Sequence, residues 1–179
     1  IWGSYEKSNA DDYWSYATDF DGTALGGSSR KVDVYIATSS SVNITGGDLL
    51  VSGATTASTT IQSMGTATYG ITIGRSASTT WQYYEIRDVD TSGLVFTGTP
   101  NVNSLSSGDI DVSQNTGSAI TVGGTVITQN PAKNFNLNRF TLSAGSGFNV
   151  TATGTSVSSW RFVNHYGGLD GEANDVDPD

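Results

Sequence analysis

The feature of this sequence that most constrains its fold is a regular spacing of short apolar clusters. One series of cluster centres advances by 25 or 26 residues at each step, and its members are Ile36, Ile61, Ile86, Val112, Leu137 and Phe162. A second series has the members Ile44, Ile71, Phe96, Val122 and Phe148, and a third, weaker one has Val51, Ala77, Val102, Ile127 and Thr153. A sustained internal period of this length is typical of a chain built from stacked repeats.

The residues around each centre alternate between apolar and polar types. Val32, Val34 and Ile36 share one face of an extended segment, and glycine pairs such as Gly46-Gly47 separate such segments. Alternation with a period of two predicts strands with one buried face. Three short strands in each repeat predict a parallel β-helix of five or six coils, spaced about 4.8 Å apart. A β-sandwich or jelly roll is the alternative, because it also contains many closely spaced short strands.

Composition excludes several classes of function. The chain has 179 residues, with 17 acidic and 8 basic side chains and a net charge of −9, so its surface should repel nucleic acid. It has no cysteine, which excludes disulfides, thiolate metal sites and a cysteine nucleophile. No apolar run reaches the roughly 20 residues of a membrane helix, so we expect no membrane insertion. An acidic surface poor in lysine favours a secreted or cell-surface protein.

The two ends differ in composition from the middle. Residues 1–30 are rich in aromatic and acidic side chains and are predicted to cap the β-helix, which should span residues 31–166. Residues 167–179 are acidic and predict an exit loop or linker. Because a β-helix exposes strand edges at its ends, we expect end-to-end contacts with other copies or with neighbouring domains, anchored by Trp2 and Trp14.

One predicted surface strip could contact a ligand. If Ile86 and Val112 point inward, their sequence neighbours point outward, so the first series predicts a strip of Tyr83, Glu85, Arg87, Asp109 and Asp111. In this register Glu85 lies beside Asp111, and Tyr83 beside Asp109. A solvated face with ion pairs is the simpler interpretation. Surface glycans are the candidate ligand, since sugar-binding faces place exposed aromatic rings, which stack on the apolar faces of sugars, beside polar groups.

Two acidic clusters suggest metal binding, at Asp19 and Asp21 and at Asp175 and Asp177. Carboxylate oxygens beside glycine turns favour calcium, although a turn or a linker is the simpler interpretation. We expect no other cofactor. His165 is the single histidine, and no nucleophile motif lies near it, so the sequence does not indicate an enzyme.

Two short sequence segments resemble segments of a known class of proteins. The stretches WQYYEIRD at residues 81–88 and SWRFVNH at residues 159–165 resemble β-helical segments of large, repetitive, adhesin-like exoproteins of the bacterial cell surface. The resemblance covers about the last hundred residues. It implies a right-handed parallel β-helix that serves as an extracellular scaffold.

These observations predict an extracellular structural or adhesive module of a bacterial surface assembly, without catalysis. A filament subunit is one version of this prediction. The alternative is a carbohydrate-binding or polysaccharide-active β-helix domain, with a lyase or hydrolase as its enzymatic form. That alternative depends on the strip around Glu85 and Asp109.

Overall fold

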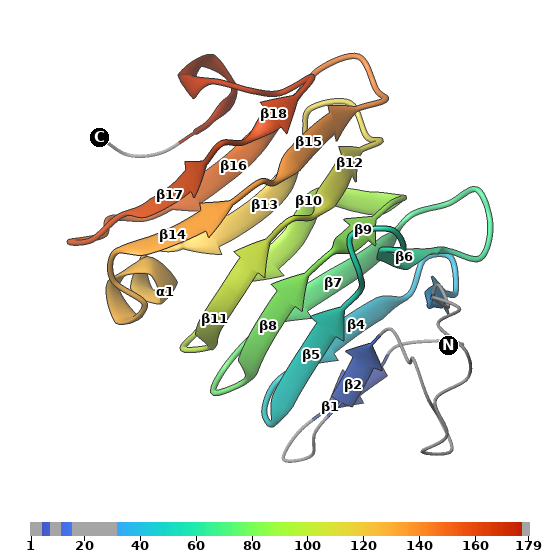
Figure 1. Cartoon of the computed structure of the whole chain (residues 1–179), viewed down its shortest axis with the longest axis horizontal. Coiled ribbons are helices and arrows are strands. Elements are labelled where there is room, and N and C mark those ends of the chain that lie inside the picture. The colour runs from blue at the N-terminus through green and yellow to red at the C-terminus, as the bar shows by residue number, and fades with distance from the viewer. Residues whose placement is uncertain (1–4, 8–11, 16–31, 177–179) are drawn as a thin grey trace.

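The protein is an all-β solenoid of about five turns, in which parallel sheets form the walls (Figure 1). The computed structural model describes residues 5–7, 12–15 and 32–176. Within them the helical structure is limited to α1 (Gly124–Gln129) and the short 3-10 helix η1 (Glu172–Asn174).

Four parallel sheets contain the strands. In spatial order, the first sheet has β1 (Tyr5–Lys7), β4 (Ser41–Ile44), β7 (Tyr69–Ile73), β10 (Val89–Phe96), β13 (Gly117–Gly123) and β16 (Gly147–Thr153). The second has β11 (Asn101–Ser106), β8 (Ser78–Gln82), β5 (Asp48–Ser52) and β2 (Asp12–Ser15). The third has β18 (Tyr166–Gly167), β15 (Arg139–Leu142), β12 (Asp109–Val112), β9 (Tyr84–Ile86), β6 (Thr59–Ser63) and β3 (Asp33–Ile36). The fourth pairs β14 (Lys133–Asn136) with β17 (Trp160–Val163).

Successive strands of the chain visit the sheets in rotation. For example, β7, β8 and β9 lie in the first, second and third sheets, and β10 returns to the first sheet beside β7. All pairings between named strands are parallel, which confirms the predicted β-helix. The β-sandwich alternative is wrong, because a sandwich is built from antiparallel sheets.

Apolar side chains of equivalent strands stack inside the solenoid. In the third sheet the paired positions are Val34, Ile61, Ile86, Ile110 and Phe140. In the first sheet they are Ile44, Ile73, Phe96 and Val122. Apart from the partly buried Val34, these side chains are at most 1% exposed. Burial of each contributes about 1.5–3 kcal/mol to folding, so the interior ladders supply most of the stability.

The predicted inward ladder is correct only in part. Ile61 and Ile86 are direct neighbours, whereas Ile36 pairs with Ser63, and Val112 lies two residues beyond the position that pairs with Ile86. Leu137 is 49% exposed, so its assignment to the interior is wrong.

Other members of the three series are also misplaced. Phe162 packs partly buried in the fourth sheet, and Phe148 pairs with Ser118 instead of Val122. Ile127 lies in α1, and Thr153 lies in the first sheet. A constant spacing therefore identified the coils but not every inward position.

The exposure of Leu137 follows from its place at a corner of the coil. Each of the last four strands of the third sheet is preceded by a turn that contains one residue with φ between 51° and 57°. These residues are Tyr83, Ser107, Leu137 and Asn164. Their backbones also stack, because the Leu137 amide donates to the Val163 carbonyl at 3.0 Å. A residue in this left-handed conformation turns the chain, and its side chain leaves the wall.

An excursion between β13 and β14 explains why the spacing fails after Val112. Thr60 and Glu85 in adjacent coils are separated by 25 residues, whereas Asp109 and Arg139 are separated by 30. The longer coil contains α1, which projects from one corner (Figure 1). Extra residues are accommodated in the corner, so the pairing of the following strands is preserved.

Two buried asparagines fix the corners of this longer coil. Asn130 accepts from the Val102 amide at 2.9 Å and donates to the Pro100 and Val126 carbonyls. Asn138 is fully buried, and its Oδ1 accepts from the Tyr84 hydroxyl at 3.0 Å.

Asn138 also bonds to two backbone groups of the preceding coil. Oδ1 accepts from the Gly108 amide at 3.3 Å, while Nδ2 donates to the Leu105 carbonyl at 2.8 Å. The Tyr84 ring fills the space above Gly108, where an added Cβ would lie 2.0 Å from a ring atom. One side chain thus links three consecutive coils.

The two ends continue the sheets. In the predicted capping segment, β1 pairs with β4, and β2 pairs with β5. In the predicted exit segment, the Val176 amide donates to the Val150 carbonyl at 2.9 Å, which places Val176 against β16. The capping and linker roles of residues 1–30 and 167–179 stay predictions.

Replacing Ile86 by aspartate should unfold or strongly destabilise the protein. Ile86 is 0% exposed between Ile61 and Ile110, so the variant loses apolar burial and places a carboxylate among apolar side chains. We expect Ile86→Asp to lower the free energy of unfolding by at least about 3 kcal/mol in urea denaturation. Leu137→Asp is the matched control, and its effect should stay within about 0.5 kcal/mol. Equal effects of the two variants would contradict the assignment of these positions.

Replacing Asn138 by leucine should also destabilise the fold. The change leaves the Tyr84 hydroxyl, the Gly108 amide and the Leu105 carbonyl without their partner. We expect a loss of about 2–4 kcal/mol, measured as a lower midpoint in chemical denaturation. Asn136→Leu, at an exposed position on β14, is the control and should change stability by less than about 0.5 kcal/mol.

Candidate functional site

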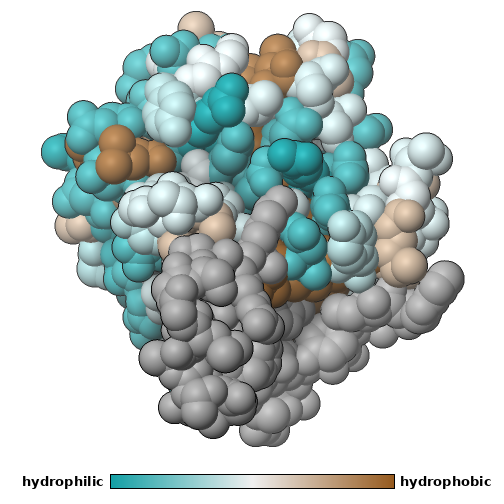
Figure 2. Space-filling view, turned by 45° about the vertical axis from the view of Figure 1, so that its right-hand side comes forward, coloured by the Kyte–Doolittle hydropathy of each residue, from teal (hydrophilic) through white to brown (hydrophobic). Residues whose placement is uncertain are grey.

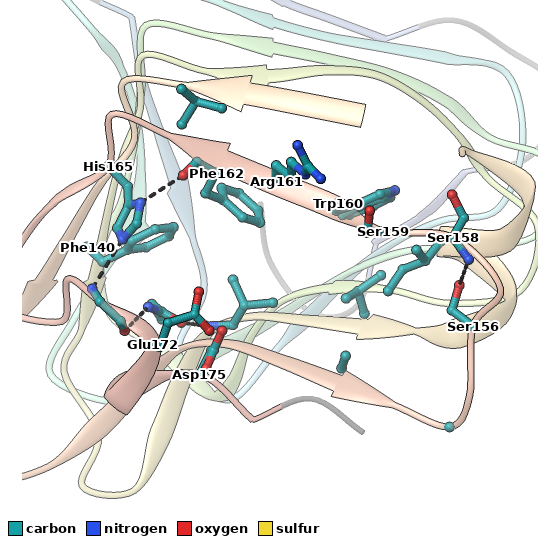
Figure 3. A pocket seen from close by; sticks show the side chains of 18 residues that line it. Phe140, Ser156, Ser158, Ser159, Trp160, Arg161, Phe162, His165, Glu172 and Asp175 are labelled. Atoms are coloured by element: carbon teal, nitrogen blue, oxygen red, sulfur yellow. Dashed lines mark hydrogen bonds between the residues drawn. The ribbon is translucent and has the colours of Figure 1, made fainter. Parts of the chain in front are cut away.

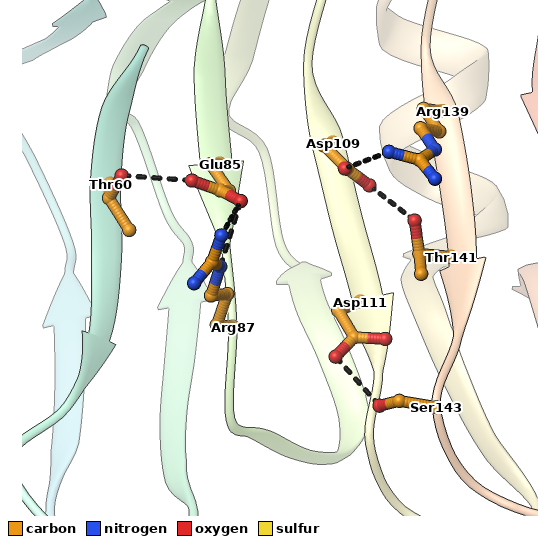
Figure 4. A network of polar contacts seen from close by, with 8 residues as sticks. All are labelled: Thr60, Glu85, Arg87, Asp109, Asp111, Arg139, Thr141 and Ser143. Atoms are coloured by element: carbon orange, nitrogen blue, oxygen red, sulfur yellow. Dashed lines mark hydrogen bonds and ion pairs between the residues drawn. The ribbon is translucent and has the colours of Figure 1, made fainter.

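The predicted polar strip lies on the outer face of the third sheet, in a different register from the one expected. Glu85 on β9 pairs with Asp109 on β12, and Asp109 pairs with Arg139 on β15. Asp111 pairs with Thr141 in the next row. Side chains from neighbouring coils therefore meet directly across the strands, as Figure 4 shows.

Each carboxylate of the strip has its own set of partners. Glu85 accepts from Nε of Arg87 at 2.8 Å, forms an ion pair with the same guanidinium group, and accepts from the Thr60 hydroxyl at 3.0 Å. Asp109 accepts from the Thr141 hydroxyl at 2.8 Å and from Arg139 at 3.3 Å.

Asp111 differs from the other two carboxylates. Its Oδ2 accepts from the Ser143 hydroxyl at 2.7 Å. Its Oδ1 is enclosed and has no hydrogen-bond partner among the residues that the structure describes. An enclosed carboxylate oxygen without a partner is costly, because it loses water and gains no donor in return.

The strip is hollowed into a depression of about 440 Å³. Its walls come from four consecutive strands of the third sheet and the turn after β9. The lining residues are Gln62, Glu85, Arg87, Asp88, Asp109, Asp111, Arg139 and Thr141.

Tyr83 does not belong to the depression. It lies at the corner between β8 and β9 with φ 51°, and its carbonyl accepts from the Thr59 amide at 3.0 Å. The predicted contacts of Glu85 with Asp111 and of Tyr83 with Asp109 are therefore wrong. Both errors follow from assuming equal coil lengths.

Arg139, Thr141 and Gln62 also belong to this surface and were not predicted from the sequence. Arg139 lies 30 residues after Asp109, outside the 25-residue period. The alternation of Arg139, Phe140 and Thr141 marks a strand with polar side chains on one face. That pattern was the available signal, but it does not give the register.

Burial and like charges disfavour ionisation of Asp109. Partial desolvation raises the pKa of Asp109 above its ordinary value, and the nearby carboxylates of Glu85 and Asp111 raise it further. The Thr141 hydrogen bond and the Arg139 charge oppose these effects without cancelling them. The strip therefore concentrates negative charge that its two arginines only partly balance.

A second hollow, of about 480 Å³, lies in the last coil (Figure 3). Trp160 and Phe162 point into it from β17, and Val150 and Ala152 line it from β16. The rings form an edge-to-face cluster with inner residues, including Phe135 and Trp160 with centroids 5.1 Å apart. This hollow lies at the C-terminal end of the solenoid interior, and polar residues such as Arg161, Glu172 and Asp175 border it together with the apolar ones.

His165 borders this hollow and has a structural role. Its Nδ1 lies 2.8 Å from the Phe162 carbonyl, and its Nε2 accepts from the Gly171 amide at 3.2 Å. Both ring nitrogens are thus occupied by the backbone of β17 and of the C-terminal segment.

The predicted metal and assembly residues lie mostly outside the described residues. This is the case for Asp19, Asp21, Asp177 and Trp2. Asp175 borders the hollow of the last coil, and within residues 5–7, 12–15 and 32–176 no group of three or more acidic or histidine side chains could hold a metal ion. Calcium binding stays a prediction.

The backbone of Trp14 pairs with Val51, which places Trp14 on the N-terminal edge strand of the second sheet.

In the described part of the chain, no helix is long and apolar enough to cross a membrane. Comparisons with models of protein families, with curated proteins and with solved structures returned no match. The fold therefore defines the class of this chain, a β-solenoid.

Stability should respond to pH through Asp109. Because folding raises the pKa of this carboxyl above its ordinary 3.8, the folded protein binds more protons than the unfolded chain between the two values. The contribution of Asp109 to stability therefore falls as pH rises through this window. Asp109→Asn removes that contribution.

We expect the free energy of unfolding of Asp109→Asn, minus that of the wild type, to increase from about pH 3 upward and then level off. Urea denaturation of both proteins at several pH values measures this difference. A difference that is flat or decreases with pH would contradict the raised pKa.

Proposed function

We propose that this chain is an extracellular structural module of a bacterial surface assembly, without catalysis, that contacts other copies or neighbouring domains end to end. The observation that carries the proposal is the geometry of the last coil. There the interior is hollow and lined by Trp160, Phe162 and Val150. The residues that pair with Phe162 and Val150 in the preceding coil, Phe135 and Ile120, are at most 1% exposed.

Several exposed apolar side chains lie in the last coils. Leu137, Val163 and Tyr166 are 49%, 41% and 51% exposed, and Val176 is 41% exposed. Elsewhere hydrophilic residues predominate on the side shown in Figure 2, with small, separate hydrophobic patches. Apolar exposure on a polar molecule favours an interaction site, and a coil with the same three-sided outline would fit it.

Charge and composition support lateral separation and an extracellular location. The net charge of −9 opposes side-by-side clustering, so the ends are the favoured contact surfaces. The resemblance to adhesin-like exoproteins rests on residues 81–88, which span the corner between β8 and β9, and on residues 159–165, which contain β17. Both are wall segments, as expected of a scaffold.

Self-association tests the proposal. We expect the wild-type chain to form concentration-dependent, end-to-end oligomers in sedimentation velocity and elongated particles in electron micrographs. Val163→Lys, on β17 at the open end, should weaken association at least about tenfold, because a lysine on an edge strand blocks further strand pairing.

Gln82→Lys is the matched control, since Gln82 is exposed on β8, which lies inside the second sheet between β5 and β11 and away from both ends. It should associate like the wild type. A wild-type chain that stays monomeric at all concentrations would contradict self-assembly. Release of sugar products from a polysaccharide by the purified protein would contradict the absence of catalysis.

A further inference from the structure

We propose that the depression on the third sheet binds a linear, uncharged polysaccharide lying across the strands, parallel to the solenoid axis. The site consists of Gln62, Glu85, Arg87, Asp109, Asp111, Arg139 and Thr141. This inference goes beyond the structural role proposed above and does not depend on it.

The depression combines exposed donors with recessed acceptors. The Arg87 and Arg139 side chains are 50% and 49% exposed, whereas those of their partners Glu85 and Asp109 are 19% and 27% exposed. Arg139 uses Nη1 for Asp109, and Arg87 uses Nε and Nη2 for Glu85. The ion pairs therefore fix two guanidinium groups whose other N–H groups can donate to a ligand.

Asp111 supplies the observation that points to a missing partner. Asp111 lines the depression, while its Oδ1 is enclosed and accepts no hydrogen bond from the described residues. Rotation of the carboxylate is needed to present this oxygen to a ligand. A hydroxyl group can donate to a carboxylate oxygen without introducing a charge. Because a sugar hydroxyl both donates and accepts, neighbouring hydroxyls can serve the Asp111 carboxylate and an arginine together.

The charge balance selects an uncharged ligand. Four carboxylates and two guanidinium groups line the depression, so an anionic polymer would meet net repulsion. A cation would have to displace Arg87 or Arg139 from its carboxylate, and the acidic side chains do not form a metal-binding group in the described part of the chain. Neutral hydroxyl groups avoid both costs.

The solenoid repeat also fits a linear saccharide. Adjacent strands are separated by about 4.8 Å, which is close to the length of one sugar ring along a chain. The depression crosses β6, β9, β12 and β15, so one sugar unit can contact each strand (Figure 4).

One exposed aromatic ring flanks the depression at each end, and the two rings belong to neighbouring rows of paired residues. Tyr35, 48% exposed on β3, pairs with Gln62, and Tyr166, 51% exposed on β18, pairs with Arg139. A ring at such a position can stack on the apolar face of a sugar. A longer chain would therefore continue along the same axis.

Calorimetric titration with cellohexaose, maltohexaose, mannohexaose and xylohexaose tests the proposal, with polygalacturonate as the acidic comparison. We expect at least one neutral oligosaccharide to bind, with an affinity that rises with length up to about six units, because the rings on β3 and β18 extend the site by one strand at each end. Arg139→Gln and Asp111→Asn should each weaken binding at least about tenfold.

Arg75→Gln is the matched control, because Arg75 is an exposed arginine in the turn after β7, away from the third sheet. It should bind like the wild type, and circular dichroism should show that all variants are folded. Failure of every neutral oligosaccharide to bind at millimolar concentration would overturn the proposal. So would binding of polygalacturonate alone, or equal weakening by Arg75→Gln.

Discussion

Hydrogen bonding between equivalent strands of successive coils is the interaction on which the whole structure depends. Parallel pairing joins each strand to the one in the next coil, so the backbone groups of the strands are satisfied along the axis. The same pairing brings like positions into contact, which aligns Ile61, Ile86 and Ile110 inside and Glu85, Asp109 and Arg139 outside. Core and candidate site are therefore products of one register.

The register of strand pairing explains which features of the fold could be predicted from the sequence and which could not. Alternation and repeated spacing predicted parallel coils with Ile61 and Ile86 in contact, because these signals are local and that coil has the predicted length. Leu137 was misplaced because its apolar character hid its role as a corner residue with φ 57°. Sequence spacing does not reveal a left-handed turn at a residue type that rarely adopts one.

The sequence predicted that the candidate site is a polar face, but it did not predict all of the residues that form it. Glu85 and Asp109 do share a polar face, since both precede an inward isoleucine. Arg139 could not be placed beside them, because the α1 excursion between the two coils lengthens the separation to 30 residues. The Asn138 side chain that helps to hold this longer coil in register was likewise hidden, since a buried asparagine looks like a loop residue in the sequence.

The direction of the inter-coil hydrogen bonds has a mechanical consequence. In a solenoid under tension along its axis, these bonds lie parallel to the pull, and a coil at one end can detach before the next is loaded. Side chains such as Asn138, which joins Leu105, Gly108 and Tyr84, would act as local reinforcements against this peeling. The protein should therefore lengthen in steps of one coil under load and absorb work gradually instead of rupturing at once.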